Sequence, residues 1–255
     1  NLWGTKYGRG SFIKNFNNML ECKKYNYEPF ERNYSGSKRI KVCLKEEKFY
    51  GKFTEDFEKL KSGKENTILK CCSAECLSFI PSASIDAVVT DPPYYSAINY
   101  GEISEFFYSW QRLLLKECSD VFKPEHICID NEVTVNRVKG IEKDEFQKRL
   151  TVCFGELYRV LKPEGPMILT YNNSSIDGWC VLFNALNDSG FSVSEVYPVY
   201  MEYNAGLIEN RRQKMNYDLV IWAVKKTKHM EPALSLKEFI LEFSITEQET
   251  MKNYR

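Results

Sequence analysis

Short apolar runs alternate with longer amphipathic segments between residues 67 and 226, and this alternation is the clearest pattern in the chain. Runs of β-favouring residues predict strands, whereas apolar residues three or four positions apart predict helices. The predicted strands are residues 67–72, 85–90, 166–171, 192–202 and 216–224, and the predicted helices between them are residues 102–118, 143–161 and 176–187. This order is typical of an α/β sheet with right-handed crossovers. The last two strands have no helix between them and are expected to pair antiparallel.

The rest of the chain is less regular and predicts a division into three regions. They are an N-terminal appendage (residues 1–66), the sheet-forming region (residues 67–226) and a C-terminal helical tail (residues 227–255). In the appendage, apolar spacing predicts one amphipathic helix over residues 54–60, and Ser35-Gly36-Ser37 predicts a turn. Basic residues that alternate with glutamates in this region are interpreted as a solvated surface: Lys38, Arg39, Lys41, Lys45 and Lys48.

The overall composition narrows the class of protein. The 255 residues include 35 Lys and Arg against 35 Asp and Glu, so nucleic-acid or membrane binding through bulk charge is excluded and only a local basic patch could serve. With 43% hydrophobic and 27% charged residues the chain is predicted to fold, and no apolar run approaches the roughly 18 residues of a membrane span. Nine irregularly spaced cysteines favour reduced thiols, so we expect a cytoplasmic protein.

The segment most indicative of chemistry is Asp91-Pro92-Pro93-Tyr94, which directly follows the apolar run at residues 85–90. Ligand sites of open α/β sheets lie at the carboxyl ends of strands, so this position suits a site. Two prolines stiffen the turn, and the Asp91 carboxylate and the Pro92 carbonyl offer acceptors for both hydrogens of an exocyclic amine. Tyr94 offers a flat ring for stacking, as a base flipped out of a duplex would require. A plain Pro-Pro turn is the alternative, but the full tetrapeptide after an apolar strand favours the amine site.

This segment also carries a resemblance to a known family. TDPPYY with the preceding IDAVV resembles the catalytic strand and loop of amino-methyltransferases that act on adenine N6 or cytosine N4. Two further stretches are similar to bacterial and archaeal adenine-specific DNA methylases that often carry a zinc-ribbon insertion: GRGSFIKNFNNMLECKKYNYEPFERNYSGS and NYGEISEFFYSWQRLLL. Two later stretches look like the later strands of the S-adenosylmethionine methyltransferase fold: FGELYRVLKPEGPMILTYNN and GWCVLFNALNDSGFSVSEVYPVYME. The resemblance covers about residues 8–225. It implies a Rossmann-like S-adenosylmethionine-dependent methyltransferase sheet with an antiparallel last strand, present here complete or in part.

The resemblance implies methylation of the N6 amine of adenine in DNA, with S-adenosylmethionine as cofactor and no metal. Asp91 and the Pro92 carbonyl would accept hydrogen bonds from the amine, Pro93 would stiffen the turn, and Tyr94 would stack on the flipped base. Ser73 is a candidate for cofactor binding beside Asp91, because Cys72-Ser73-Ala74 stands where the family has Gly-Asp-Ala.

The candidate substrate contacts form two groups. Tyr95, Asn99 and Tyr100 follow the tetrapeptide and are predicted to form or close the base pocket. Arg211, Arg212 and Lys214 lie in a basic loop between the last two strands and suit DNA phosphates, although a solvated charged loop explains them equally well.

Two features of the family are missing from this sequence. We find neither the glycine-rich cofactor loop after a first strand nor the acidic residue after a second strand, and in family order both would lie upstream of Asn1. The chain is therefore interpreted as the catalytic half of a longer methyltransferase, with DNA and the missing N-terminal half as partners. Cytosine-N4 methylation is the first alternative, and a catalytically incomplete half-domain that binds DNA or a partner chain is the second.

Three other clusters are assigned structural roles. Cys71, Cys72 and Cys76 lack the paired spacing of a zinc ribbon and are predicted to be buried thiols. Phe106, Phe107, Tyr108 and Trp110 lie in a predicted helix and are expected to belong to the core. An apolar stripe predicts the helix of the tail: Leu234, Leu236, Phe239, Ile240 and Phe243.

Overall fold

The computed structural model describes residues 11–35, 38–44, 51–96, 98–129, 132–173, 175–200 and 217–226. Its contacts divide the chain into two units, Asn1–Cys71 and Cys72–Arg255. The predicted helical tail, residues 227–255, lies outside the described residues. Within the described ranges, no helix has the length and apolar character needed to cross a membrane.

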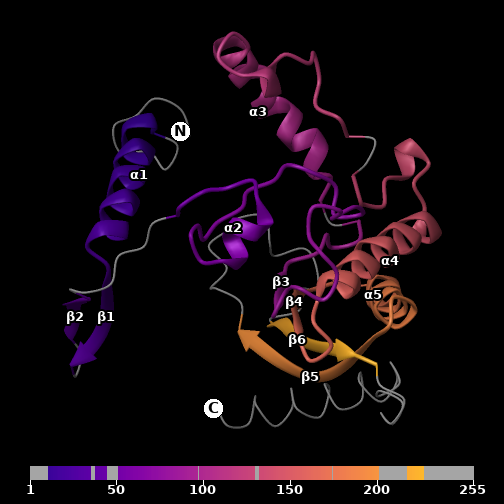
Figure 1. Cartoon of the computed structure of the whole chain (residues 1–255). Coiled ribbons are helices and arrows are strands. Elements are labelled where there is room, and N and C mark those ends of the chain that lie inside the picture. Colours follow the sequence, from indigo (N-terminus) through magenta and orange to yellow (C-terminus); the bar gives the residue numbers. More distant parts are fainter. Residues whose placement is uncertain are drawn as a thin grey trace. The chain divides into compact units, whose positions relative to one another are not determined.

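The first unit contains a helix, a β-hairpin and a short second helix (Figure 1). These elements are α1 (Phe12–Tyr27), β1 (Phe30–Ser35), β2 (Lys38–Cys43) and α2 (Phe57–Lys61). The helix predicted over residues 54–60 corresponds to α2, which begins after Asp56 because the Asp56 side chain accepts a hydrogen bond from the Glu58 N–H at 2.9 Å. Neither α1 nor the hairpin is predicted by the sequence pattern.

The absence of burial explains why α1 has a weak sequence signal. None of its residues is buried, and its apolar side chains, from Phe12 (81% exposed) to Leu20 (45% exposed), face solvent or each other. The helix ends where Pro29 follows Glu28, because a proline disfavours helical backbone in the residue before it. The strands β1 and β2 are rich in charge, and the short apolar alternation of Ile40 and Val42 in β2 buries neither residue, since they are 45% and 40% exposed.

The described residues of the second unit form a four-stranded mixed sheet and three long helices. The elements are β3 (Val88–Thr90), α3 (Tyr100–Leu115), α4 (Lys143–Val160), β4 (Met167–Tyr171), α5 (Ile176–Asp188), β5 (Phe191–Tyr200) and β6 (Tyr217–Lys225), with 3-10 turns at Asp120–Phe122 and Arg137–Lys139. The strand order is β3-β4-β6-β5. Strands β3 and β4 are parallel, whereas β6 pairs antiparallel with both β4 and β5. The chain therefore has the predicted α/β fold with an antiparallel last strand, and β6 is inserted between β4 and β5.

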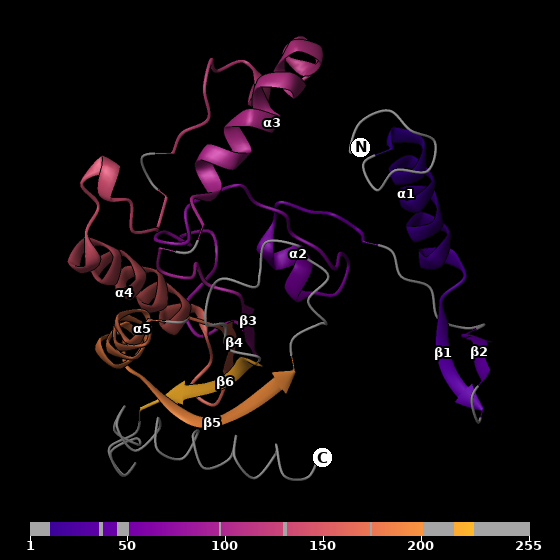
Figure 2. The ribbon, with the colours of Figure 1, turned by 180° about the vertical axis from the view of Figure 1, so that it is seen from behind.

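The core of the second unit lies between the sheet and the helices α4 and α5, which lie side by side in both views (Figures 1 and 2). Met167, Leu169 and Tyr171 alternate along β4 and have no exposed surface. They pack with side chains of α4, such as Phe154, and of α5, such as Leu182. Burial of this many large apolar side chains is the main stabilising contribution to this unit.

Two strand predictions are wrong in part. Residues 67–72 form no strand, and of these only Thr67 makes a bridge, with Phe53. The run at residues 85–90 shortens to β3 and is not buried on both faces, since the Val89 side chain is 79% exposed. The reason is that β3 lies at the edge of the sheet, and in the described part of the chain no strand pairs with its outer side.

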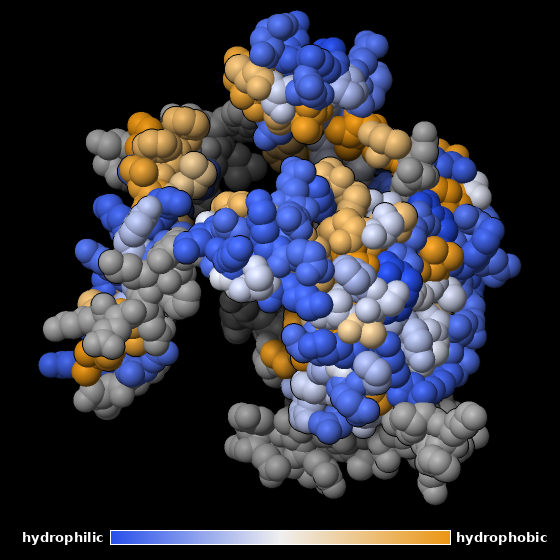
Figure 3. All heavy atoms as spheres, viewed as in Figure 1, coloured by the Kyte–Doolittle hydropathy of each residue, from blue (hydrophilic) through white to orange (hydrophobic). Residues whose placement is uncertain are grey.

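The core predicted in α3 is also wrong for three of its four aromatic residues. Phe106, Phe107 and Trp110 are between 53% and 62% exposed, and Figure 3 shows hydrophobic residues exposed among hydrophilic ones over this helix. Only Tyr108 is buried, with its hydroxyl donating to the carbonyls of Val121 and Pro124. Cysteines 71, 72 and 76, predicted to be buried, are likewise exposed.

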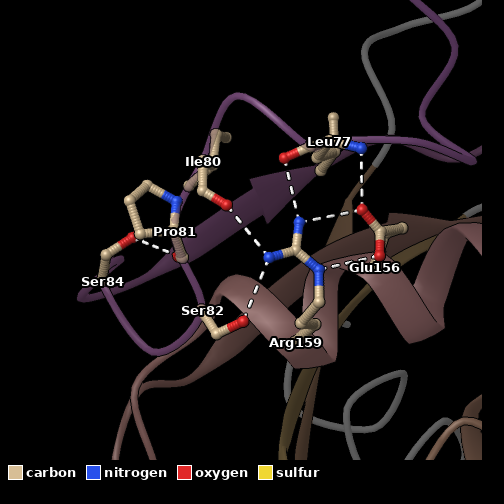
Figure 4. A network of polar contacts seen from close by, with 7 residues as sticks. All are labelled: Leu77, Ile80, Pro81, Ser82, Ser84, Glu156 and Arg159. Carbon is tan, nitrogen blue, oxygen red and sulfur yellow. Dashed lines mark hydrogen bonds and ion pairs between the residues drawn. The ribbon is translucent and has the colours of Figure 1, made fainter.

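A polar network anchors the segment that leads into β3 (Figure 4). The Arg159 guanidinium of α4 donates to the carbonyls of Leu77 at 2.9 Å and Ile80 at 3.0 Å, and to the Ser82 hydroxyl at 3.2 Å. The Glu156 carboxylate, paired with Arg159 at 2.8 Å, accepts from the Leu77 N–H at 2.7 Å. This network lowers the pKa of Glu156 to about 2, chiefly through the hydrogen bond from Arg159. It ties residues 77–82 to α4 and so helps to place the start of β3.

Candidate functional site

The Asp91-Pro92-Pro93-Tyr94 turn lies at the carboxyl end of β3, next to the carboxyl end of the parallel strand β4. The register pairs Thr90 with Leu169, so the two strands bring Asp91 beside Thr170. Two segments that are far apart in sequence, the tetrapeptide and the Thr170-Tyr171-Asn172-Asn173 run, therefore meet at one edge of the sheet. This is where open α/β sheets place their ligand sites.

The Asp91 carboxylate is held through one of its two oxygens. Its Oδ1 atom accepts hydrogen bonds from the Tyr94 hydroxyl at 2.7 Å and from the Thr170 hydroxyl at 2.6 Å. Among the described residues no donor reaches the other oxygen, Oδ2, and the residue as a whole is exposed. The carboxylate is thus fixed in orientation and still presents an acceptor.

The Tyr94 ring is turned toward the protein. It lies edge-to-face against the Tyr171 ring, with the ring centroids 5.2 Å apart, and is half-buried. Burial and the hydrogen bond to Asp91 both raise the pKa of its hydroxyl, so the hydroxyl remains a donor across the physiological range. The sequence-based interpretation assigned a role to the ring alone, and the structure adds a contact of the hydroxyl.

The turn is closed by a residue in an unusual backbone conformation. Tyr95 has a φ of +56°, in the left-handed region, and its N–H donates to the Pro93 carbonyl at 3.0 Å. Its own carbonyl accepts from the Val135 N–H and from the Thr134 hydroxyl, each at 3.0 Å. Non-glycine residues with such a φ are held in place by their surroundings and cluster at functional sites. Pro92 is buried, and no described donor reaches its carbonyl.

The other predicted substrate contacts are dispersed. The Tyr95 ring packs edge-to-face on Phe146 of α4 at 5.5 Å, in the interior. Asn99 is the residue before α3 and makes no side-chain cap to that helix, and Tyr100 is 48% exposed at its first position. The basic group Arg211, Arg212 and Lys214 lies outside the described residues. The four residues Asp91–Tyr94 form one turn, and among the described residues no hydrogen bond or ring contact joins Asn99 or Tyr100 to it.

Two polar residues at this edge of the sheet were missed by the sequence interpretation. Thr170 bonds Asp91, and the Asn173 amide lies 3.5 Å from the Tyr94 carbonyl. The Asn173 side chain packs against Gly178 of α5, where only a glycine leaves room for it. A Cβ on residue 178 would lie 2.4 Å from the Asn173 amide nitrogen. The sequence could have indicated both residues, because they lie at the carboxyl end of the strand predicted over residues 166–171. The tetrapeptide follows the carboxyl end of the parallel strand predicted over residues 85–90.

The described residues do not form a cradle for S-adenosylmethionine. Ser73 is exposed and its hydroxyl bonds Glu75, which is itself paired with Arg149 through two oxygens at 2.9 and 3.0 Å. No strand ends at Ser73, contrary to prediction. The glycines with the closest surroundings, Gly101, Gly165 and Gly178, face other atoms of this chain and not an open cradle. In the described ranges no group of His, Cys, Asp and Glu is suited to a metal ion.

Comparison with known proteins yields only partial structural likeness. No protein-family model and no curated protein sequence matches the chain. A candidate DNA modification methylase from Thermus thermophilus, solved with S-adenosyl-L-methionine, aligns at 15% identity and a TM-score of 0.35 over 63% of this chain and 55% of its own.

Two further solved structures are similar to the same degree. The cytosine-N4-specific PvuII DNA methyltransferase aligns at 16% identity and a TM-score of 0.35, over 58% of this chain and 44% of its own. The M1.HpyAVI–SAM complex aligns at 14% identity and a TM-score of 0.27, over 71% of this chain and 62% of its own. The chain thus spans about half the length of these structures, and likeness at these scores decides nothing about its reaction.

Proposed function

We propose that this chain carries the base-binding part of a DNA methyltransferase that acts on the N6 amine of adenine. The single observation that supports this is the Asp91 carboxylate, whose Oδ1 is held by Tyr94 and Thr170 while Oδ2 accepts from no described donor. An exocyclic amine has two hydrogens to donate. Asp91 Oδ2 and the Pro92 carbonyl are the acceptors that the turn offers for them.

The chemistry asked of these residues is orientation and charge stabilisation. An amine on an aromatic ring is a weak nucleophile because its lone pair is delocalised into the ring. Two fixed acceptors on its hydrogens favour a more tetrahedral nitrogen, and the Asp91 charge stabilises the positive charge that develops there during attack. The Tyr94 and Thr170 donors keep the carboxylate from rotating, so little reorganisation is needed at the moment of reaction.

The methyl donor in this proposal is S-adenosylmethionine, whose sulfonium supplies an electrophilic methyl group when bound. Because the described residues do not form a cradle for it, we expect the chain alone to bind the cofactor poorly. Each missing charge-assisted hydrogen bond forfeits about 1.5–3 kcal/mol, so two or three losses weaken binding by several powers of ten. Isothermal titration of the chain with S-adenosylmethionine measures this affinity, and micromolar binding would show that the chain holds a complete cofactor site.

The decisive experiment is Asp91→Ala in a preparation that transfers tritiated methyl groups to DNA. Loss of one charged acceptor on the reacting amine removes about 2–4 kcal/mol of transition-state stabilisation, so the rate falls by roughly 30- to 1,000-fold. Asp91→Asn is the matched control for size, and it also loses most of the activity because its charge is gone. A rate for Asp91→Ala within a few-fold of the parent contradicts the proposal.

Methylation of cytosine N4 is the first alternative, because the same pair of acceptors suits that amine. An aspartate at the head of the tetrapeptide favours adenine in the family that the sequence resembles. Digestion of the labelled DNA to nucleosides separates N6-methyladenine from N4-methylcytosine and decides between them.

A second candidate function is that of a half-domain completed by another segment, and the edge of β3 is the observation that favours it. Val88 donates its N–H toward β4, to the Pro166 carbonyl at 3.0 Å, so the alternation of a parallel ladder turns the N–H and carbonyl of Val89 outward. Val89 is 79% exposed, and α3 exposes Leu114 (81%) and Trp110 (62%) in the same unit. A strand added at this edge would cover Val89, and the segment that supplies it could also supply the cofactor cradle.

A further inference from the structure

The zero net charge of the chain conceals a strong asymmetry between its two units. Residues 1–71 hold 16 of the Lys and Arg residues against 9 Asp and Glu, whereas residues 72–255 hold 19 against 26. The first unit therefore has an excess of seven positive charges, and the second an equal excess of negative charges. A domain with such an excess attracts polyanions even though the whole chain is neutral.

The β1–β2 hairpin, here called the ribbon (Phe30–Ser35 and Lys38–Cys43), places two of these charges together. Its antiparallel register sets Arg32 directly opposite Lys41. Both side chains lie over the Phe30 ring, the Arg32 guanidinium carbon at 5.5 Å and the Lys41 Nζ at 4.1 Å from its centroid. Both residues are exposed, and the Phe30 ring is held in turn by the edge of Tyr25 at 5.2 Å.

This arrangement has a cost that folding alone does not explain. Like charges directly opposite each other on neighbouring strands destabilise a hairpin. The cation–π contacts with Phe30 offset part of this cost and limit the freedom of both side chains. One carboxylate, Glu21 of α1, lies close enough for Lys41 to help lower its pKa, but its hydrogen bond goes to Lys24 at 2.7 Å. The paired cations are thus prearranged and exposed, with no carboxylate hydrogen-bonded to them among the described residues.

We propose that the ribbon binds the sugar–phosphate backbone of DNA through Arg32 and Lys41. Exposed cations held in a fixed pair suit phosphate oxygens, and such contacts position a protein on a duplex without reading its sequence. The Phe30 ring is occupied by the two cations and so serves to hold them, not to stack on a base. That the polyanion is DNA rests on the proposed function. That Arg32 and Lys41 bind phosphate groups does not depend on it.

The ribbon can be tested by the salt dependence of DNA binding. Fluorescence anisotropy of a labelled duplex with the full chain gives the slope of log K against log salt, whose magnitude falls by about 0.9 for each phosphate that the protein no longer neutralises. We expect Arg32→Ala with Lys41→Ala to reduce this slope by about 2 and to weaken binding about ten-fold or more at ~0.1 M salt. The control Lys59→Ala with Lys61→Ala removes two exposed charges from α2 in the same unit and leaves the slope unchanged.

Further arms separate a local contact from bulk charge and from unfolding of the first unit. Arg32→Lys with Lys41→Arg keeps both charges and is expected to keep the slope, and circular dichroism of the alanine pair checks that the first unit remains folded. An equal loss of slope in the α2 control would mean that bulk charge binds the duplex and would overturn the proposal. So would binding to phosphatidylserine vesicles, or to an acidic protein, with no binding to DNA.

The outcome is distinguishable from that of the proposed methylation. Asp91→Ala lies in the other unit and is expected to keep the parent salt slope while losing methyl transfer. Ribbon-dependent binding in a preparation whose Asp91→Ala variant keeps the parent rate of methyl transfer would leave the ribbon proposal standing and overturn only the proposed reaction. A slope that does not change in the Arg32 and Lys41 variant overturns the ribbon proposal whatever the activity.

Discussion

The unit that carries the Asp91 turn and the unit that carries the ribbon differ in how their side chains are held. In the second unit, α4 and α5 bury Phe154 and Leu182 against the sheet, and the polar groups of the site are fixed at the end of that buried sheet. In the first unit, α1 buries nothing and the ribbon is organised by stacking and charge. A rigid site for chemistry is thus built on burial, whereas an open cationic surface suits a ligand that itself supplies the contacts.

The largest expected difference between the units is in core truncation. Leu182→Ala in α5, where the side chain has no exposed surface, should lower the free energy of unfolding by about 2–5 kcal/mol through reduced burial and a cavity. Phe16→Ala in α1, 46% exposed, should change it by no more than about 0.5 kcal/mol. Urea unfolding followed by circular dichroism measures both variants, and equal losses of stability would show that the two units do not differ in how burial holds them.

The next effect concerns how firmly the site is held. Tyr94→Phe keeps the ring but removes one of the two donors to Asp91 Oδ1, so methyl transfer should fall about ten-fold, or ~1.5 kcal/mol. The sequence alone, which assigned only stacking to Tyr94, predicts almost no change. Thr170→Val is the matched variant for the second donor and should act similarly. Full activity in both would mean that the carboxylate needs no fixed orientation.

A pH dependence is expected from the network before β3. The pKa of Glu156 is lowered from 4.5 to about 2, so in the unfolded chain this group takes up a proton at a higher pH than in the folded one. Its stabilising contribution is therefore complete above pH 4.5 and is lost as the pH falls toward 2. Glu156→Gln should be less stable than the parent near neutral pH, and the gap should close in acid. Urea midpoints across this range measure it, and a gap that stays constant contradicts the assignment.

The smallest expected effect is on the stability of the ribbon. Arg32→Ala with Lys41→Ala removes a repulsive cross-strand pair, so the stability of the folded chain should be unchanged or rise by about 0.2–1 kcal/mol. Thermal unfolding of the same variant used for DNA binding provides the measurement. A clear loss of stability would show that the cations are structural, in contrast to their proposed role.

Local pattern sufficed for much of the second unit. The segments predicted as 143–161, 166–171 and 176–187 are α4 (Lys143–Val160), β4 (Met167–Tyr171) and α5 (Ile176–Asp188). Apolar periodicity identifies these elements because each buries one face or both. The buried positions are apolar, so the spacing of apolar residues follows the period of the helix or strand. The tetrapeptide was also located correctly after a strand, because its prolines and its position need no distant partner.

The tertiary structure determines which side chains are buried and which residues become hydrogen-bond or cross-strand partners. The hydrogen bond from Thr170 to Asp91 and the place of β6 between β4 and β5 depend on strand order and register. The exposure of Phe106, Phe107 and Trp110 depends on what packs against α3. Likewise, Arg32 and Lys41 are nine positions apart in a charged stretch that looks solvated, and only the hairpin register makes them neighbours. A sequence records which side chains are apolar or charged, whereas burial and pairing depend on what the fold brings opposite them.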